Sequence, residues 1–135
     1  MITAANRVGR LVESRLVPPI TVDEIDAFER ERTELTAKAG ENRVTVIDVS
    51  RVTILPPQLI DRLIASLRKP GVPALRSAML MSGSATFALQ MSRLNRETEY
   101  PTRRTFTDAR ELEAWLAEVL DPNERARLTE FLAGR

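Results

Sequence analysis

The stretch from Val44 to Leu67, VTVIDVSRVTILPPQLIDRLIASL, decides the fold class of this chain. It begins with a β-branched apolar run, which is typical of a strand buried on both faces in the middle of a sheet. After Pro56 and Pro57, apolar residues recur with helical spacing and predict a helix that packs on that sheet. Its apolar stripe consists of Leu59, Ile60, Leu63, Ile64 and Leu67. A strand, a short loop and a sheet-covering helix together predict an α/β domain.

Two carboxylates in this stretch are candidates for an acid–base pair. Asp48 lies near the end of the predicted strand, and Asp61 lies about one helical turn past Pro57. General acid–base chemistry requires such a pair to share a cleft, with a nucleophile or bound water beside it. The simpler interpretation is that Asp48 accepts hydrogen bonds from loop N–H groups and that Asp61 is solvated. We therefore predict no catalytic residues.

The composition removes several classes of function. The 135 residues fit one domain, residues 1–135, and contain no cysteine and no histidine. Thiol nucleophiles, thiolate metal sites and imidazole bases are therefore excluded, and we predict a protein that is not an enzyme and has no cofactor or metal. A net charge of +1, from 20 basic and 19 acidic residues, gives no overall field that favours nucleic acid.

No apolar stretch approaches the roughly 18 residues of a membrane span, and the first residues lack the apolar core of a signal peptide. The sequence therefore predicts a cytoplasmic protein with no membrane span.

The first 40 residues predict a strand or hairpin followed by a helix. Residues 7–17 are expected to form one strand or a hairpin bent at Gly9. Thr21 and Glu24 predict a capping box at the start of the helix, and Gly40 predicts its end. Arg32 interrupts the apolar stripe of this helix, and we interpret it as a side chain that reaches out to solvent.

The second half of the chain alternates strand and helix signals. A turn is expected at 69–73, strands at 77–81 and 102–106, and helices after Ser84, Asp108 and Asp121. Together with the preceding elements, this pattern predicts a small mixed sheet of four to five strands layered with helices. Residues 121–135 are expected to form an added C-terminal helix.

Two groups of polar residues in this half are candidate ligand sites. Ser82, Gly83 and Ser84 follow a predicted buried strand and open a helix, which is where α/β folds bind phosphates, and Arg51 or Arg76 would add a cation. The alternative is that these serines only cap the helix, because the glycine spacing of nucleotide loops is absent. A second group contains four arginines and is interpreted as a solvated face too small for nucleic acid. These are Arg93, Arg96, Arg103 and Arg104.

The order of a strand, Asp48-x-Ser50-x-Val52-Thr53, two apolar residues and a helix resembles the STAS domain family, and its SpoIIAA-like branch in particular. A second segment, RRTFTDARELEAWLAEVL from Arg103 to Leu120, resembles the closing strand and helix of SpoIIAA-like proteins. The resemblance covers roughly residues 7 to 120. It implies a STAS-like mixed sheet whose first strand is antiparallel to a neighbour.

The resemblance also implies a partner-binding surface at the loop after the central strand and the start of the next helix. Its residues here are Ser50, Arg51, Thr53, Pro56, Pro57, Gln58, Asp61 and Arg62. In the family, a serine in this loop is phosphorylated by a partner kinase, and Pro57 stands at the matching position. The phosphoswitch of the family is therefore expected to be absent. Ser50 and Thr53 are interpreted as turn-forming side chains rather than phosphorylation sites.

Two functions remain open from the sequence. The first is a non-enzymatic regulatory module, similar to anti-sigma-factor antagonists, whose partner is a regulatory or kinase-like protein. The alternative is a small-molecule or lipid-binding module with an apolar pocket between helix 84–95 and the sheet, which would require about 300 Å³ or more. The short apolar face of helix 121–135 is expected to pack either on its own domain or on a second copy, and we predict a homodimer.

Overall fold

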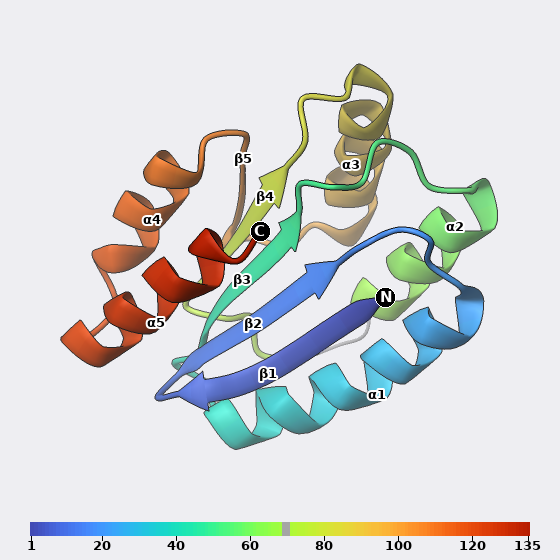
Figure 1. Ribbon diagram of the computed structural model, residues 1–135. Helices are drawn as coiled ribbons and strands as arrows, with labels where there is room; N and C mark the ends of the chain where they lie inside the picture. The colour runs from blue at the N-terminus through green and yellow to red at the C-terminus, as the bar shows by residue number, and fades with distance from the viewer. Residues whose placement is uncertain (69–70) are drawn as a thin grey trace.

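The computed structural model describes residues 1–68 and 71–135, so the turn predicted at 69–73 lies partly outside the described residues. One five-stranded sheet carries helices on both faces, which confirms the predicted α/β class (Figure 1). The strands are β1 (Ile2–Val8), β2 (Leu11–Leu16), β3 (Val44–Val49), β4 (Arg76–Met81) and β5 (Arg103–Phe106). The helices are α1 (Val22–Ala39), α2 (Pro57–Leu67), α3 (Ala85–Thr98), α4 (Ala109–Ala117) and α5 (Pro122–Ala133).

The strands lie in the sheet in the order in which they occur in the chain, β1-β2-β3-β4-β5. β1 is antiparallel to β2, and every other pair is parallel, so the predicted mixed sheet with an antiparallel first strand is confirmed. β3 is the central strand, as its β-branched run predicts. The hairpin at Gly9 is also confirmed, but β1 begins at Ile2 and not at residue 7. This edge strand is rich in small and polar residues and has only a weak apolar signal.

Two separate apolar cores lie on the two faces of the sheet. α1, α2 and α3 cover one face and enclose a core that includes Ile25, Ile60 and Phe87 (Figure 1). On the other face, α4 packs on β4 and β5 and α5 packs on β1 and β2, and Leu112, Leu116 and Leu128 belong to a second core. The alternation of side chains along β3 explains the division, since Val44 and Val46 belong to one core and Val49 to the other.

The helix boundaries follow local capping chemistry. Thr21 accepts a hydrogen bond from the N–H of Glu24, and Gly40 ends α1 at φ 88°. The reciprocal half of the predicted box is not formed, because the Glu24 carboxylate pairs with the terminal amino group of Met1 at 3.2 Å. Asp121 and Glu124 form both halves of a capping box at the start of α5. α5 is therefore a separate helix, as predicted.

α5 lies on the sheet of its own chain. Leu128, Phe131 and Leu132 are all buried in the core beneath it. The apolar face that motivated the predicted homodimer is therefore covered within one molecule, and the homodimer stays a prediction without that support. Within the described part of the chain, no helix is both long and apolar enough to cross a lipid bilayer.

Ion pairs hold α5 to the hairpin. Arg127 binds Glu13 of β2 with two hydrogen bonds of 2.8 and 2.5 Å. Arg10 binds the buried carboxylate of Glu124 with its backbone N–H at 2.6 Å and its guanidinium at 2.9 Å. Gly9 has φ +54°, and a Cβ there would clash with the carboxylate of Glu124, so both its backbone conformation and its neighbour favour glycine.

Candidate functional site

The loop from β3 to α2, residues 50–56, begins with a carboxylate that organises its first turn. Asp48 Oδ1 accepts hydrogen bonds from the N–H and the hydroxyl of Ser50, at 2.9 and 2.6 Å. Its other oxygen accepts a hydrogen bond from Arg15 Nε at 2.8 Å. Burial alone would raise the pKa of Asp48, but the hydrogen bonds from Ser50 and Arg15 outweigh it and lower that pKa. Asp48 is therefore an ionised cap of the loop, as the simpler interpretation predicts.

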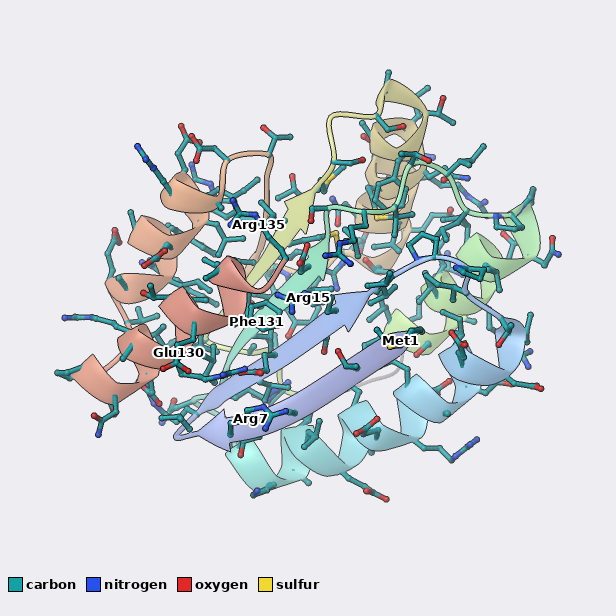
Figure 2. All side chains as sticks on the ribbon, viewed as in Figure 1. Met1, Arg7, Arg15, Glu130, Phe131 and Arg135 are labelled. Carbon is teal, nitrogen blue, oxygen red and sulfur yellow. The ribbon has the colours of Figure 1, made fainter. Side chains whose placement is uncertain are left out.

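Asp48 and Asp61 do not form a catalytic pair. Asp48 lies on the α5 side of the sheet, where its partner Arg15 also donates to the carbonyl of Phe131 and stacks 4.2 Å from its ring centroid (Figure 2). Asp61 lies on α2, on the opposite face, and pairs with Arg93 of α3 at 2.9 Å. The sheet separates the two carboxylates, so they share no cleft.

The serines predicted as an anion site bind the neighbouring loop. Ser82 donates its hydroxyl hydrogen to the carbonyl of Val52 at 2.7 Å, and Ser84 donates to the carbonyl of Thr53 at 2.6 Å. Ser84 also accepts a hydrogen bond from the N–H of Phe87 and so caps α3. Gly83 between them has open space around its Cα. These hydroxyls are engaged by the loop and the helix, and anion binding here stays a prediction.

Neither arginine proposed for that site is bound to it. Arg76 is at the start of β4, whereas the serines follow its end, and it binds Glu118 of the α4 C-terminus at 3.0 Å. The suggestion that Arg76 supplies a cation to the serines is therefore wrong. Arg51 is exposed on the loop at the correct end of the sheet.

The second half of the loop is held by α3. Gln90 accepts a hydrogen bond from the N–H of Leu55 at 3.0 Å and donates one to its carbonyl at 2.7 Å. Within the loop, the side chains of Val52 and Leu55 are buried, but that of Ile54 between them is 60% exposed. Leu89, next to Gln90, is 74% exposed. The loop thus has a fixed backbone and presents an apolar side chain to solvent.

The predicted partner-binding residues lie together on this end of the molecule. Seven of them are exposed on the loop and α2, and Ser50 is half-buried under its bond to Asp48. The exposed members are Arg51, Thr53, Pro56, Pro57, Gln58, Asp61 and Arg62. Arg62 binds Asp26 of α1 with two hydrogen bonds of 2.8 and 2.9 Å. We call the loop 50–58 with Asp61 and Arg62 the loop surface.

The apolar pocket expected between helix 84–95 and the sheet is nearly filled. About 40 Å³ remains there, lined by Val49, Met79, Phe87, Met91 and Leu94 among others. An open depression of about 340 Å³ lies where α3 meets β5, but polar side chains such as Ser92, Asn95 and Thr105 contribute much of its wall. Neither space is the enclosed apolar pocket that a lipid would need.

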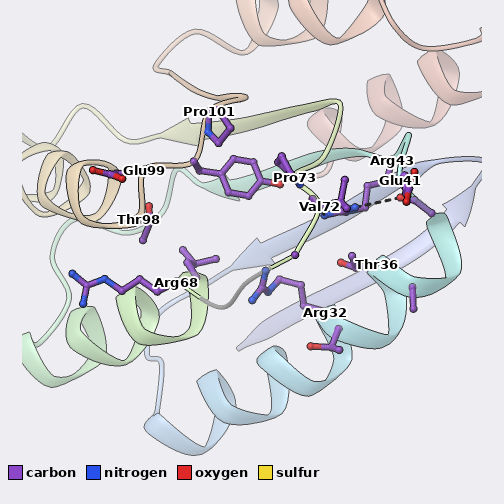
Figure 3. Close-up of a pocket in the computed structure, with 16 residues that line it drawn as sticks. Arg32, Thr36, Glu41, Arg43, Arg68, Val72, Pro73, Thr98, Glu99 and Pro101 are labelled. Carbon is purple, nitrogen blue, oxygen red and sulfur yellow. Dashed lines mark hydrogen bonds between the residues drawn. The ribbon is translucent and has the colours of Figure 1, made fainter.

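A larger cavity opens at the opposite end of the sheet, near the amino ends of the parallel strands (Figure 3). It has a volume of about 600 Å³ and is bordered by the C-terminal parts of α1, α2 and α3. Arg32 lines it and is half-buried, with its Nε inaccessible and its guanidinium group bonded to Ser66 of α2, so its charged end does not simply reach out to solvent as predicted. Arg103, predicted on a solvated face, lines an adjoining recess and is also part-buried. An arginine within an apolar stripe was the one sequence signal that pointed to this cavity.

No group of three or more acidic, histidine or cysteine residues able to hold a metal ion occurs in the described ranges. No family model and no curated protein matches the sequence. The five-stranded mixed sheet is compatible with a small STAS-like α/β fold, and membership of the STAS family stays a prediction.

Proposed function

We propose that this protein is a non-enzymatic regulatory module that binds a protein partner through the loop surface. The observation that carries the proposal is Ile54, a large apolar side chain that is 60% exposed on a loop fixed on both sides of it. The carbonyl of Thr53 accepts a hydrogen bond from Ser84, and the backbone of Leu55 forms two with Gln90. A partner that covers Ile54 gains apolar burial without having to order the loop.

The surroundings of Ile54 also suit a protein interface. Pro56 and Pro57 are exposed and rigid, and Arg51 and Gln58 supply polar groups at the rim. Leu89, one residue before Gln90 on α3, is a second exposed apolar side chain in this half of the molecule. Protein interfaces commonly place an apolar centre within such a polar rim.

Regulation by phosphorylation at the position used in the STAS family is absent from this proposal, because Pro57 has no acceptor oxygen. Ser50 is a poor substitute acceptor, since its hydroxyl hydrogen is donated to Asp48 and a phosphate there would meet that carboxylate. Partner binding is therefore proposed to be controlled by the partner's own state or concentration.

The test is an affinity capture from the native host that compares wild type with two variants of equal charge change. Ile54→Asp places a charge in the centre of the loop surface. Leu75→Asp does the same at an apolar side chain that is 43% exposed near the start of β4. We expect one protein to be retained by wild type and Leu75→Asp and lost with Ile54→Asp, by at least about tenfold in Kd when the purified pair is titrated, because a charge would be desolvated at the interface.

Two results would contradict the proposal. Equal capture by all three proteins would place the interface elsewhere, and loss with Leu75→Asp alone would move it to the other end of the sheet. Circular dichroism of each variant establishes that the fold is retained before capture is compared.

A further inference from the structure

The cavity at the amino ends of the strands, and the recess that adjoins it, bring together three arginines from distant parts of the chain. Arg32 comes from α1, Arg43 immediately precedes β3, and Arg103 begins β5. Arg32 and Arg43 line both the cavity of about 600 Å³ and the recess of about 40 Å³, and Arg103 lines the recess. Figure 3 shows Arg32 extending from α1 towards the cavity.

These three guanidinium groups have only neutral hydrogen-bond partners among the described residues. Arg43, which is 8% exposed, donates to the carbonyls of Gly40 and Val72 at 3.3 and 2.6 Å. Arg32 donates to the carbonyl and hydroxyl of Ser66 at 3.3 and 3.4 Å. Arg103 donates to the Thr98 hydroxyl at 3.0 Å and stacks 4.6 Å from the ring centroid of Tyr100.

The Nε groups of Arg32 and Arg103 are buried and have no hydrogen-bond partner within residues 1–68 and 71–135. Burial lowers the pKa of both guanidinium groups. Tyr100 opposes this shift, and a smaller repulsion between neighbouring arginines adds to it, from Arg43 on Arg32 and from Arg32 on Arg103. Each group still remains charged at neutral pH, because arginine does not lose its proton in proteins. Buried, like-charged and incompletely bonded groups are costly unless an anion compensates them.

Two carboxylates border the cavity, but they do not compensate these charges. Glu41 and Glu99 are exposed, and neither forms an ion pair with any of the three arginines. The sheet below supplies hydroxyls instead, where Thr45 donates to Ser77 at 2.7 Å on the floor of the recess. Positive charge and hydroxyl groups together form an environment that suits an oxyanion.

We propose that this cavity binds a small organic phosphate, with its phosphate group between Arg32, Arg43 and Arg103 where the cavity meets the recess. A phosphate offers several oxygens and up to two charges, which match three guanidinium groups better than a single carboxylate does. A volume of about 600 Å³ is far more than a phosphate ion fills, and lies in the range of small-molecule sites. Leu67, Val72 and Pro73 line the rest of the cavity and would pack on the organic part.

The test uses inorganic phosphate and pyrophosphate as probes, with sodium chloride and citrate at matched ionic strength. Bound anion stabilises the folded state, so the melting temperature of wild type should rise by roughly 5–10 °C with phosphate or pyrophosphate at about 100 times Kd. Chloride should have no such effect, and citrate a smaller one. ³¹P NMR line broadening of pyrophosphate gives a second readout on wild type alone.

Matched variants locate the site. Arg32→Met removes one cation from the cavity and should weaken phosphate binding at least about tenfold, as expected for a charge-assisted contact. Arg110→Met makes the same charge change at an exposed position of α4, away from both the cavity and the loop surface, and should leave phosphate binding unchanged. If Arg32→Met does not fold, Arg103→Met takes its place.

Three results would overturn the proposal. The first is no line broadening and no phosphate-specific rise in the wild-type melting temperature. The second is an equal rise with chloride or a larger one with citrate. The third is an equal loss of phosphate binding in Arg32→Met and Arg110→Met. Partner capture through the loop surface is independent of all three, because the cavity and the loop surface lie at opposite ends of the strands.

Discussion

Two sets of arginines, one on each face of the sheet, meet different partners. On the face covered by α4 and α5, Arg10, Arg15 and Arg127 bind the carboxylates of Glu124, Asp48 and Glu13. On the face covered by α1, α2 and α3, Arg32, Arg43 and Arg103 bind only carbonyls, hydroxyls and an aromatic ring. The first set holds α5 against the β1–β2 hairpin. The second set leaves positive charge beside a cavity, where a ligand can compensate it.

The comparison predicts opposite effects of mutation in the two sets of arginines. Removing one member of a paired set leaves its buried partner uncompensated and should destabilise the fold strongly. Removing one arginine of the unpaired set relieves repulsion and desolvation, and should stabilise the free protein.

The largest effect is expected from truncation after Leu120, which removes α5. The core would lose Leu128, Phe131 and Leu132, and Glu13 and Arg10 would lose their partners. Full burial of such side chains contributes about 1.5–3 kcal/mol each, so the loss exceeds about 5 kcal/mol, comparable to the whole stability of many domains. Circular dichroism should show a largely unfolded chain. A folded truncated chain with half the mass of wild type in light scattering would show instead that α5 mediates a dimer.

Glu124→Ala should have the next largest effect. Glu124 is 1% exposed and accepts hydrogen bonds from Arg10 and from the N–H of Asp121. Its loss should lower the free energy of unfolding by about 3–5 kcal/mol, measured by urea denaturation. Glu130→Ala is the control, because the Glu130 side chain is 72% exposed in its pair with Arg127 and should change stability by no more than about 0.5 kcal/mol. Similar decreases in the free energy of unfolding in both variants would show that burial does not determine how much these ion pairs contribute.

Acid should lower the stability of the fold by less than Glu124→Ala does. A protonated carboxyl group loses its charge but can still form hydrogen bonds. Burial would raise the pKa of Asp48 and Glu124, but hydrogen bonds from Ser50, Arg15 and Arg10 lower it below the ordinary values of 3.8 and 4.5. A lowered folded-state pKa contributes stability above the ordinary pKa, and that stability is lost as the pH falls through the folded value. Urea midpoints should therefore decline below about pH 5. Asp48→Asn should flatten the decline, and an unchanged slope would exclude Asp48 as a source.

The smallest effect, of opposite sign, is expected for Arg32→Met in phosphate-free buffer. Methionine fills the volume of the aliphatic stem and removes a guanidinium group whose Nε is buried without a partner. We expect the free energy of unfolding to rise by about 1 kcal/mol, measured by urea denaturation. A fall of more than about 1 kcal/mol in the free energy of unfolding would show that the bonds to Ser66 outweigh desolvation and repulsion. The two sets of arginines would then not have opposite effects on stability.

The sequence predicted the helices and strands better than it predicted the tertiary contacts between them. The central strand, the separate helix after Asp121 and the stop at Gly40 depend on side chains within a few residues of one another, and all three are confirmed. Arg32 and Arg103 were misjudged because periodicity identifies the face of an element but not what covers it. Arg32 contacts Ser66 of α2, and Arg103 contacts Thr98 of α3, and both contacts come from other parts of the chain.

The sequence by itself determined the α/β class, the absence of cysteine and histidine chemistry, and the lack of an acceptor oxygen at Pro57. These follow from residue identity and from local backbone preferences, which need no tertiary contact. Only the tertiary structure decided which charges are compensated. Glu13 and Arg127 meet across 114 residues of sequence, while Arg32 and Arg103 converge on a cavity without a carboxylate partner. The cost of a buried charge depends on the groups that folding places beside it, and no local pattern records them.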